Sequence, residues 1–179
     1  MAYTGTKAQS GNQLAVYIFG TGSLASGAWT FTTGSGSPAA PASSSVSAGW
    51  SLIGEINDFT ASGKQMKTDD ATNLQSGAEE FIATILTPGK FAGTFNSIPG
   101  FTDTGQRAVS AAFNQAPPVL ATFLIVRPKG PSQTTVGDCY VFSGLVEELN
   151  DLGNVKPDKI IRTPFSIKVS GTIAQTIGS

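Results

Sequence analysis

Alternating apolar and polar positions near the C-terminal end of the chain predict β-strands. In residues 165–170, Phe, Ile and Val occupy every second position, and Ser, Lys and Ser lie between them. Because successive side chains of a strand point to opposite faces, this period of two predicts one packed and one solvated face. Residues 138–149 are rich in β-forming residues and predict a second strand. The Asn, Asp, Gly and Pro residues of 150–158 are typical of turns, so the two strands are predicted to form an antiparallel pair, which is marginal without further strands or a helix.

Further strands are predicted upstream by short apolar or alternating runs. They cover residues 13–19, 50–56, 79–86, 91–96 and 119–127. The last run is the most apolar in the chain, and we expect it to form a central strand. A Pro-Gly pair after the third run is a strong turn signal.

One helix is predicted in the second half of the chain. Thr102 or Asp103 can cap its N-terminus, and apolar residues recur at i, i+1, i+4 and i+5 from Ala108. The helix should end at Asn114, because two prolines follow at 117–118. Strands before and after a single helix, without strand–helix alternation, predict a mainly β (α+β) fold.

The length of 179 residues indicates one domain. Residues 1–12 are small and polar and are expected to form an N-terminal arm, followed by a single domain over 13–179. Within it, residues 34–48 are nearly all Gly, Ser, Ala and Pro and are interpreted as a low-complexity loop. Residues 59–74 are polar with mixed charge, and they are interpreted either as a solvated hairpin loop or as a protruding contact loop.

The composition argues against catalytic and metal chemistry. The chain has no histidine and one cysteine, which removes His-dependent nucleophilic catalysis and the usual zinc sites. Cys139 is expected to be a buried apolar residue, with a reactive thiol as the alternative. Neighbouring carboxylates occur at 69–70, 79–80 and 147–148, but neighbours on a strand point to opposite faces and do not by themselves face each other across a cleft. We therefore expect no enzyme activity, no cofactor and no metal.

A glycine-rich sequence after the first strand superficially matches a dinucleotide-binding motif. Residues 20–25 read G-x-G-x-x-A, but no helical pattern follows them, and the next acidic residue is Glu55. The dinucleotide fingerprint needs both a helix and an acidic residue about 20 positions on, so this stretch is interpreted as a loop.

Charge and hydropathy give no sign of a nucleic-acid or membrane partner. The formal net charge is −1, and no apolar run approaches the ~18 residues that span a bilayer. The first residues lack the basic and apolar regions of a secretion signal, so we expect the chain to be made and kept in a cytoplasm.

The order of these segments resembles the major tail tube proteins of long-tailed (siphovirus) bacteriophages, the lambda major tail protein family. The segments that carry the resemblance are 14–17, 52–56, 68–70, 93–96, 106–113, 142–146 and 165–171. Together they span most of the chain after Gln13, although the 34–48 segment has no counterpart in the family pattern.

The resemblance implies an antiparallel β-sandwich or barrel flanked by one short helix. It also implies a structural role: six copies form a ring, and stacked rings form a hollow conduit for genome delivery in the virion tail, after assembly in the host cytoplasm. The implied partners are other copies of the chain, the tape measure protein, the tail terminator and the tail tip proteins. DNA would pass without specific binding, which suits a low-charge chain because each neutralised phosphate adds affinity.

The resemblance further implies that residues 59–74 and the N-terminal arm reach the next ring. The candidate inter-ring contact residues are Lys64, Lys67, Asp69 and Asp70. Exposed ion pairs contribute only about 0–1 kcal/mol each, so tube stability would have to come from repetition and apolar burial.

Two other structural or binding roles remain open at the level of sequence. One is a β-sandwich binding module, such as a lectin, an adhesin or a virion decoration protein, for which Trp29 and Trp50 are the candidate ligand contacts. The other is the tube protein of a contractile tail or a secretion machine, which shares the fold. A neighbouring sheath gene would favour the latter, and glycan binding by a monomer would favour the former.

Overall fold

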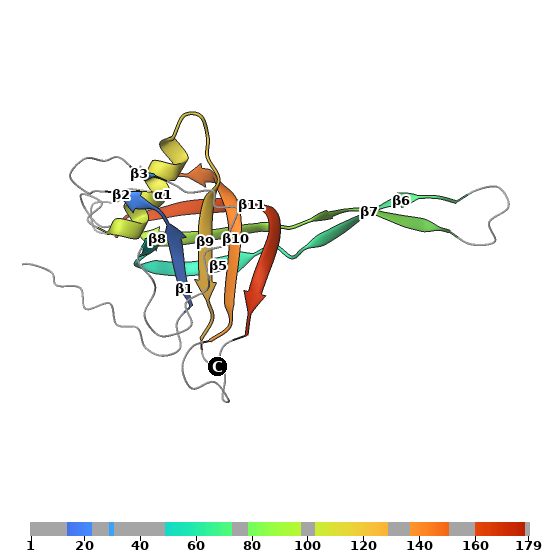
Figure 1. The fold of residues 1–179 in the computed structure, drawn as a ribbon, viewed down its shortest axis with the longest axis horizontal. Helices are drawn as coiled ribbons and strands as arrows, with labels where there is room; N and C mark the ends of the chain where they lie inside the picture. The colour runs from blue at the N-terminus through green and yellow to red at the C-terminus, as the bar shows by residue number, and fades with distance from the viewer. Residues whose placement is uncertain are drawn as a thin grey trace, which may run out of the picture.

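Antiparallel β-sheets and one α-helix make up the described part of the chain in the computed structural model (Figure 1). The described residues are 14–22, 29–30, 49–72, 79–97, 103–128, 137–150 and 160–177. The predicted N-terminal arm at 1–12 and the low-complexity loop at 34–48 lie outside them.

The strands and the helix follow one another with short connections over much of the chain. Their bounds are β1 Ala15–Phe19, β2 Thr21–Gly22, β3 Trp29–Thr30, β4 Trp50–Leu52, β5 Ile56–Ala61, β6 Gln65–Asp70, β7 Phe81–Thr87, β8 Lys90–Asn96, α1 Thr104–Asn114, β9 Ala121–Val126, β10 Cys139–Leu149 and β11 Arg162–Thr176. The predicted mainly β fold with one short helix is confirmed.

A seven-stranded sheet with the order β4-β1-β9-β10-β11-β8-β5 forms the body, and every pairing in it is antiparallel. The predicted C-terminal strand pair is present as β10 and β11, and β9 lies inside the sheet between β1 and β10. Two further sheets have two strands each, β2–β3 and β6–β7. Thr21 and Gly22 thus form a short strand, where the sequence predicted only loop.

The predicted strand over 50–56 is present only as β4 at its start and the first residue of β5 at its end, because the chain changes sheet edge within it. β4 is one edge strand of the seven-stranded sheet and β5 is the other, and only residues 53–55 separate them. The Ile53 amide donates to the Val16 carbonyl at 2.9 Å, and the Asn96 amide donates to the Glu55 carbonyl at 2.9 Å. Glu55 has φ +59°, which ends the extended run. The four Cα–Cα steps from Leu52 to Ile56 span about 14 Å at most, so the two edges approach each other here and the sheet is rolled like a barrel.

Helix α1 holds this corner in place. Asp103 is the N-cap, and its Oδ1 accepts from the Gln106 amide at 3.0 Å and from the Gly54 amide at 3.2 Å. The fully buried Gln106 side chain donates through Nε2 to the Gly54 carbonyl at 3.0 Å and to the Asn96 carbonyl at 2.9 Å. A Cβ on Gly54 would lie 2.5 Å from Asp103 Oδ2, so a side chain there would displace the cap. Corner and helix therefore form one hydrogen-bonded unit.

The main apolar core lies between α1 and the face of the sheet that it covers. From the helix it takes Ala108, Val109 and Ala112, whereas Phe113, at the margin of the predicted apolar stripe, is 40% exposed. Its buried members from the strands and the corner are Val16, Ile18, Ile53, Phe95, Ala121, Phe123, Ile125, Phe142, Val146, Leu149, Phe165, Ile167 and Val169.

A smaller cluster lies on the opposite face of the sheet. It consists of Leu124, Cys139 and Val141, and the half-buried Trp50 packs against it. Cys139 is buried as expected, and this burial raises the pKa of its thiol above the ordinary value. On β11 the expected solvated face is only partly solvated, because Ser166 lies in the covered middle of the sheet between β8 and β10.

Candidate assembly interface

Strands β6 and β7 form a two-stranded arm that extends away from the body (Figure 1). The arm continues the line of two body strands: β5 leads into β6 through residues 62–64, and β7 leads into β8 through 88–89. Residues 59–70, which the sequence placed in a polar loop, therefore belong mostly to β5 and β6. The physical reason is pairing, because β6 pairs antiparallel with β7 from Gln65 to Asp70, with one register shift between Met66 and Thr68.

The joint between arm and body is tightly hydrogen-bonded. The Ser62 amide and hydroxyl donate to the Lys90 carbonyl at 2.8 and 3.0 Å, and the Lys90 amide donates to Ser62 Oγ at 2.7 Å. Gly89 has φ +98°, and a Cβ there would collide with the Ser62 carbonyl oxygen. The expected Pro-Gly turn is thus a joint at which the chain does not reverse, since β7 and β8 pair with different strands.

Large apolar side chains are exposed on the arm. Met66, Phe81, Ile82 and Leu86 are 55%, 60%, 60% and 51% exposed. In the described part of the chain only three other large apolar side chains are exposed to a comparable degree, and they are scattered over the body. Such a concentration on a thin two-stranded element marks a contact surface, because the arm has no second layer to cover it.

The register of the arm distributes these side chains over its two faces. Met66 pairs with Leu86 and Asp70 pairs with Phe81, and a register shift between Met66 and Thr68 adds a residue to β7. Directly paired residues share a face of an antiparallel ladder. The shift therefore brings Met66, Leu86 and Phe81 onto one face, and Ile82 lies on the other with Asp69.

The structure separates the four predicted contact residues along and across the arm. Lys64 lies in the joint before β6 begins, Lys67 and Asp69 share one face of β6, and Asp70 points to the opposite face. All four are exposed. They do not form a single cluster, and ring-to-ring ion pairing by them remains a prediction.

Asp70 has a local structural role at the end of β6. Its Oδ1 accepts from the Thr72 amide at 2.8 Å, and hydrogen bonds from the side chain and backbone of Thr72 lower the pKa of the Asp70 carboxyl below its ordinary value. The Thr72 hydroxyl in turn accepts from the Glu80 amide at 3.0 Å. Asp70 therefore helps to keep the two arm strands aligned.

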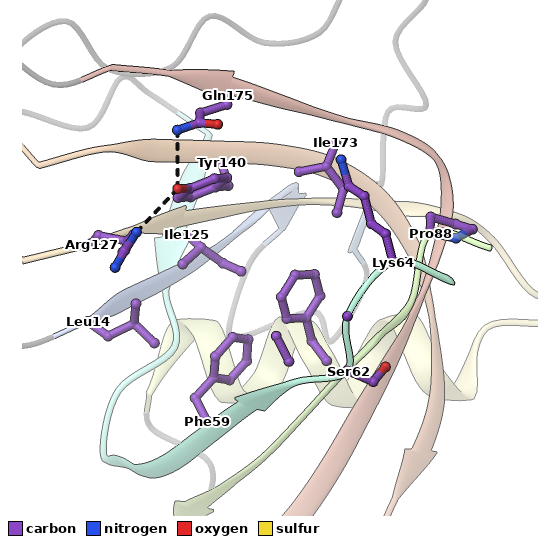
Figure 2. Close-up of a pocket in the computed structure, with 13 residues that line it drawn as sticks. Leu14, Phe59, Ser62, Lys64, Pro88, Ile125, Arg127, Tyr140, Ile173 and Gln175 are labelled. Atoms are coloured by element: carbon purple, nitrogen blue, oxygen red, sulfur yellow. Dashed lines mark hydrogen bonds between the residues drawn. The ribbon is translucent and has the colours of Figure 1, made fainter. Parts of the chain in front are cut away.

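A cavity of about 410 Å³ opens where the arm meets the body (Figure 2). It is lined by Leu14, Phe59, Ala61, Ser62, Gly63, Lys64, Pro88, Phe91, Ile125, Arg127, Tyr140, Ile173 and Gln175. These residues come from the arm joint, from β5, β8, β9, β10 and β11, from the position before β1 and from the position after β9. The rolled sheet thus leaves one end of its covered face open beside the arm, while α1 fills the other.

The floor of the cavity is aromatic and aliphatic. Phe59 stacks on Phe91 with ring centroids 5.5 Å apart, and Phe91 stacks on Phe142 of the core at 4.7 Å. Figure 2 shows Leu14, Ile125 and Phe59 facing the same space. The cavity is therefore a continuation of the apolar core to the surface.

One wall of the cavity is polar. Tyr140 Oη accepts from Gln175 Nε2 at 3.3 Å and from Arg127 Nη1 at 3.5 Å (Figure 2). Lys64 lies on the side of the joint, next to Ile173 in the same view. The opening thus presents two cationic side chains, Lys64 and Arg127, beside an apolar floor.

The described residues contain no arrangement suited to metal binding: no three His, Cys, Asp or Glu side chains gather there. The carboxylate pairs at 79–80 and 69–70 are exposed on the arm, and Glu147 forms an ion pair with Lys90 at 3.0 Å. Among these residues no helix has the length and apolarity to cross a membrane.

The sequence did not identify the exposed apolar residues of the arm as functional. Residues 79–86 predicted only a strand, and β6 is too polar to predict one. The cavity could not be found in the sequence, because its lining residues are spread from position 14 to position 175.

Several solved structures share the fold of this chain but have very different sequences. No family model and no curated protein matches the chain. A chain of the sheath–tube complex of PVC, an extracellular contractile injection system, superposes with a TM-score of 0.58 at 7% identity, covering 93% of this chain and 89% of that one.

Two further solved structures come from tails. A chain in the tail of an empty gene transfer agent particle with C6 symmetry gives a TM-score of 0.54 at 15% identity, over 73% of this chain and 88% of that one. The SPP1 tail tube gives 0.54 at 12% identity, over 92% and 77%. At these identities the likeness establishes the fold alone: this chain is built like chains of tail and tube assemblies.

Proposed function

We propose that this chain is a structural, non-enzymatic subunit of a viral tail tube, which assembles into stacked hexameric rings around a conduit for the genome. The observation that carries the proposal is the arm, which exposes Met66, Phe81, Ile82 and Leu86 to solvent on a two-stranded element. The fold shared with chains of tails and tubes supports it.

Apolar burial supplies the driving force for assembly. Removing apolar surface from water is worth about 25 cal/mol per Å², so four half-exposed large side chains per copy favour association when another chain covers them. Each copy gives one arm contact and receives one, so a head-to-tail contact with a neighbour in the same ring or in the next ring covers the arms throughout the assembly. Repetition around the ring then multiplies a modest contact energy.

The charge of the chain fits passage of DNA through the tube. Eleven basic and twelve acidic residues leave no excess of positive charge to bind phosphates. The surface that lines the conduit should therefore carry polar and acidic side chains, which let the genome pass without specific binding.

The proposal also covers the type of tail and the proteins that bind the tube. A lambda-type siphovirus tail, with tape measure protein, tail terminator and tail tip proteins at its ends, follows from the sequence resemblance, and the SPP1 likeness supports it. The likeness to a contractile sheath–tube complex keeps the tube of a contractile tail or secretion machine as the second candidate. A sheath protein that binds purified tubes would favour the second candidate.

Deletion of the arm tests the proposed function. Replacing residues 65–87 with Gly-Ser-Gly removes both arm strands and leaves β5, β8 and the joint intact. Deleting β6 alone would leave β7 unpaired, so a loss of assembly could not be distinguished from misfolding. We expect a folded monomer that unfolds in one cooperative transition in urea and forms no rings or tubes in negative-stain images.

The intact chain at high concentration is the reference sample, and it should form rings or hollow rods. A featureless monomer that binds glycans would support the binding-module alternative and overturn the proposal. Normal tubes from the arm-deleted chain would show that the arm is not the assembly element.

A further inference from the structure

We infer that the cavity at the arm joint is the receptor for the arm of a second copy of this chain. The inference rests on the proposed function and adds which surface accepts the arm. The proposed contact joins two surfaces. One copy provides the apolar cavity with cationic side chains at its opening, and the other provides an apolar arm segment with acidic neighbours.

The apolar parts match in kind and location. The cavity floor exposes aromatic and aliphatic surface from Phe59, Phe91 and Ile125. The arm exposes Phe81 and Ile82, each 60% accessible to solvent. The cavity of about 410 Å³ has room for one such side chain. Because Phe81 and Ile82 lie on opposite faces of the arm, only one of them can enter, and Phe81 would complete the aromatic stack that runs into the core.

The charges match as well. Phe81 and Ile82 are paired across the ladder with Asp70 and Asp69, and residues 79–80 directly before them are both glutamates. The cavity opening carries Lys64 and Arg127. On the Phe81 face the paired carboxylate is that of Asp70, and Glu79 and Glu80 directly precede Phe81 in the chain. These acidic groups around one apolar side chain would meet two cations around an apolar floor, an arrangement that fixes orientation and register.

The arm cannot fill the cavity of its own copy. It is bonded to the body through Ser62 and Lys90, and its strands extend the line of β5 and β8 away from the body (Figure 1). Phe81 and Ile82 pair with the far end of β6, whereas the cavity lies at the near end. The occupant must therefore be another copy, in a head-to-tail contact that closes into a ring or continues as a filament.

A mixing experiment with two complementary variants tests the inference. The receptor-only variant lacks residues 65–87 and keeps the cavity. The arm-only variant carries Ala61→Trp, which places an indole in the cavity opening and leaves the arm intact. Each variant alone should be monomeric by light scattering, and the mixture should form a one-to-one complex and no longer assembly.

Charge reversal then identifies the contact. Arg127→Glu in the receptor-only variant should weaken the complex by about tenfold or more and reduce its salt dependence, because it places a carboxylate against the acidic arm. Arg162→Glu is the matched control: Arg162 is exposed and lies outside the cavity, so the same charge change should alter the dissociation constant less than about twofold. Phe81→Ala in the arm-only variant should weaken the complex by about tenfold.

The outcomes separate this inference from the proposed function. If the intact chain forms tubes but Ala61→Trp and Arg127→Glu form them equally well, the cavity is not the receptor and the proposed function stands. If the intact chain forms no assembly, the proposed function fails first. A small molecule that co-purifies in the cavity, with arm binding unaffected by Ala61→Trp, would also overturn the inference.

Discussion

The chain leaves the seven-stranded sheet at the corner at residues 53–55 and again at the arm joint at 62–64, and the backbone and side chains differ between these two places. At the corner the chain leaves one sheet edge, and the buried Asp103 and Gln106 side chains satisfy the freed backbone groups of Gly54. At the joint the backbone stays paired, but the strands leave the core and carry apolar side chains into solvent. The body therefore buries its own apolar core, whereas the arm leaves large apolar side chains exposed to solvent.

The largest effect on stability should follow from a substitution that creates a new cavity in the core of the body. Phe95→Ala removes a fully buried ring that packs on Phe165 at a centroid distance of 5.4 Å. We expect a loss of about 3–5 kcal/mol in the free energy of unfolding, measured by urea denaturation. The matched arm variant, Phe81→Ala, should lose less than about 0.5 kcal/mol. Equal losses for the two variants would contradict the division between body and arm.

Gln106→Met should be the next largest effect. The substitution keeps the size of the side chain but removes the donor to the Gly54 and Asn96 carbonyls, which leaves buried acceptors unsatisfied. We expect a loss of about 2–3 kcal/mol, measured by thermal or urea unfolding. Arg107→Met, on the neighbouring half-buried position, is the control and should cost much less. A neutral Gln106→Met would show that the helix does not hold the corner.

Gly89→Ala should weaken the attachment of the arm by about 1–2 kcal/mol. Alanine disfavours φ +98°, and its Cβ would collide with the Ser62 carbonyl. Faster hydrogen exchange of β6 and β7 amides, with unchanged exchange in β9 and β10, would report this loosening. Gly63→Ala is the control, because a Cβ there meets no described atom within 4 Å. Similar exchange in both variants would count against a rigid joint.

The double variant Phe81→Ser, Ile82→Ser should separate assembly from stability. Both side chains are exposed, so the monomer's free energy of unfolding should change by no more than about 0.5 kcal/mol. Tube formation, followed by light scattering and negative-stain imaging, should be lost because the apolar contact is removed. Phe113→Ser, on the exposed side of α1, is the matched control and should still assemble.

The smallest effect concerns the exposed ion pair between Glu147 and Lys90. A hydrogen bond from Lys90 and its charge, together with the charge of Lys168, lower the pKa of the Glu147 carboxyl below its ordinary value in the folded state. The unfolded state therefore binds this proton first as pH falls. The small stabilisation is fully present at pH values above the pKa of the Glu147 carboxyl in the unfolded state. It disappears as the pH falls through the lower pKa of the folded state. Urea unfolding between pH 3 and 6 should show a slightly shallower pH dependence for Glu147→Gln, and an unchanged profile would show that the pair contributes nothing.

Local patterns predicted the elements whose conformation depends on near neighbours. The alternation from Phe165 to Val169 predicted β11, and the cap at Asp103 with the stop after Asn114 predicted α1 nearly to the residue. Cys139 was expected to be buried because its neighbours are apolar, and it is. The corner was missed because Gly54 and Glu55 are set by a helix about 50 residues away.

The sequence by itself determined a mainly β chain with one helix, no histidine chemistry and little charge, because periodicity, capping and composition are local properties. Only the tertiary structure decided that the polar β6 is a strand, that Phe81 and Ile82 lie outside the core, and that residues from 14 to 175 enclose one cavity. Those features depend on which strands pair and where the sheet rolls, and pairing between distant segments leaves no period in the sequence.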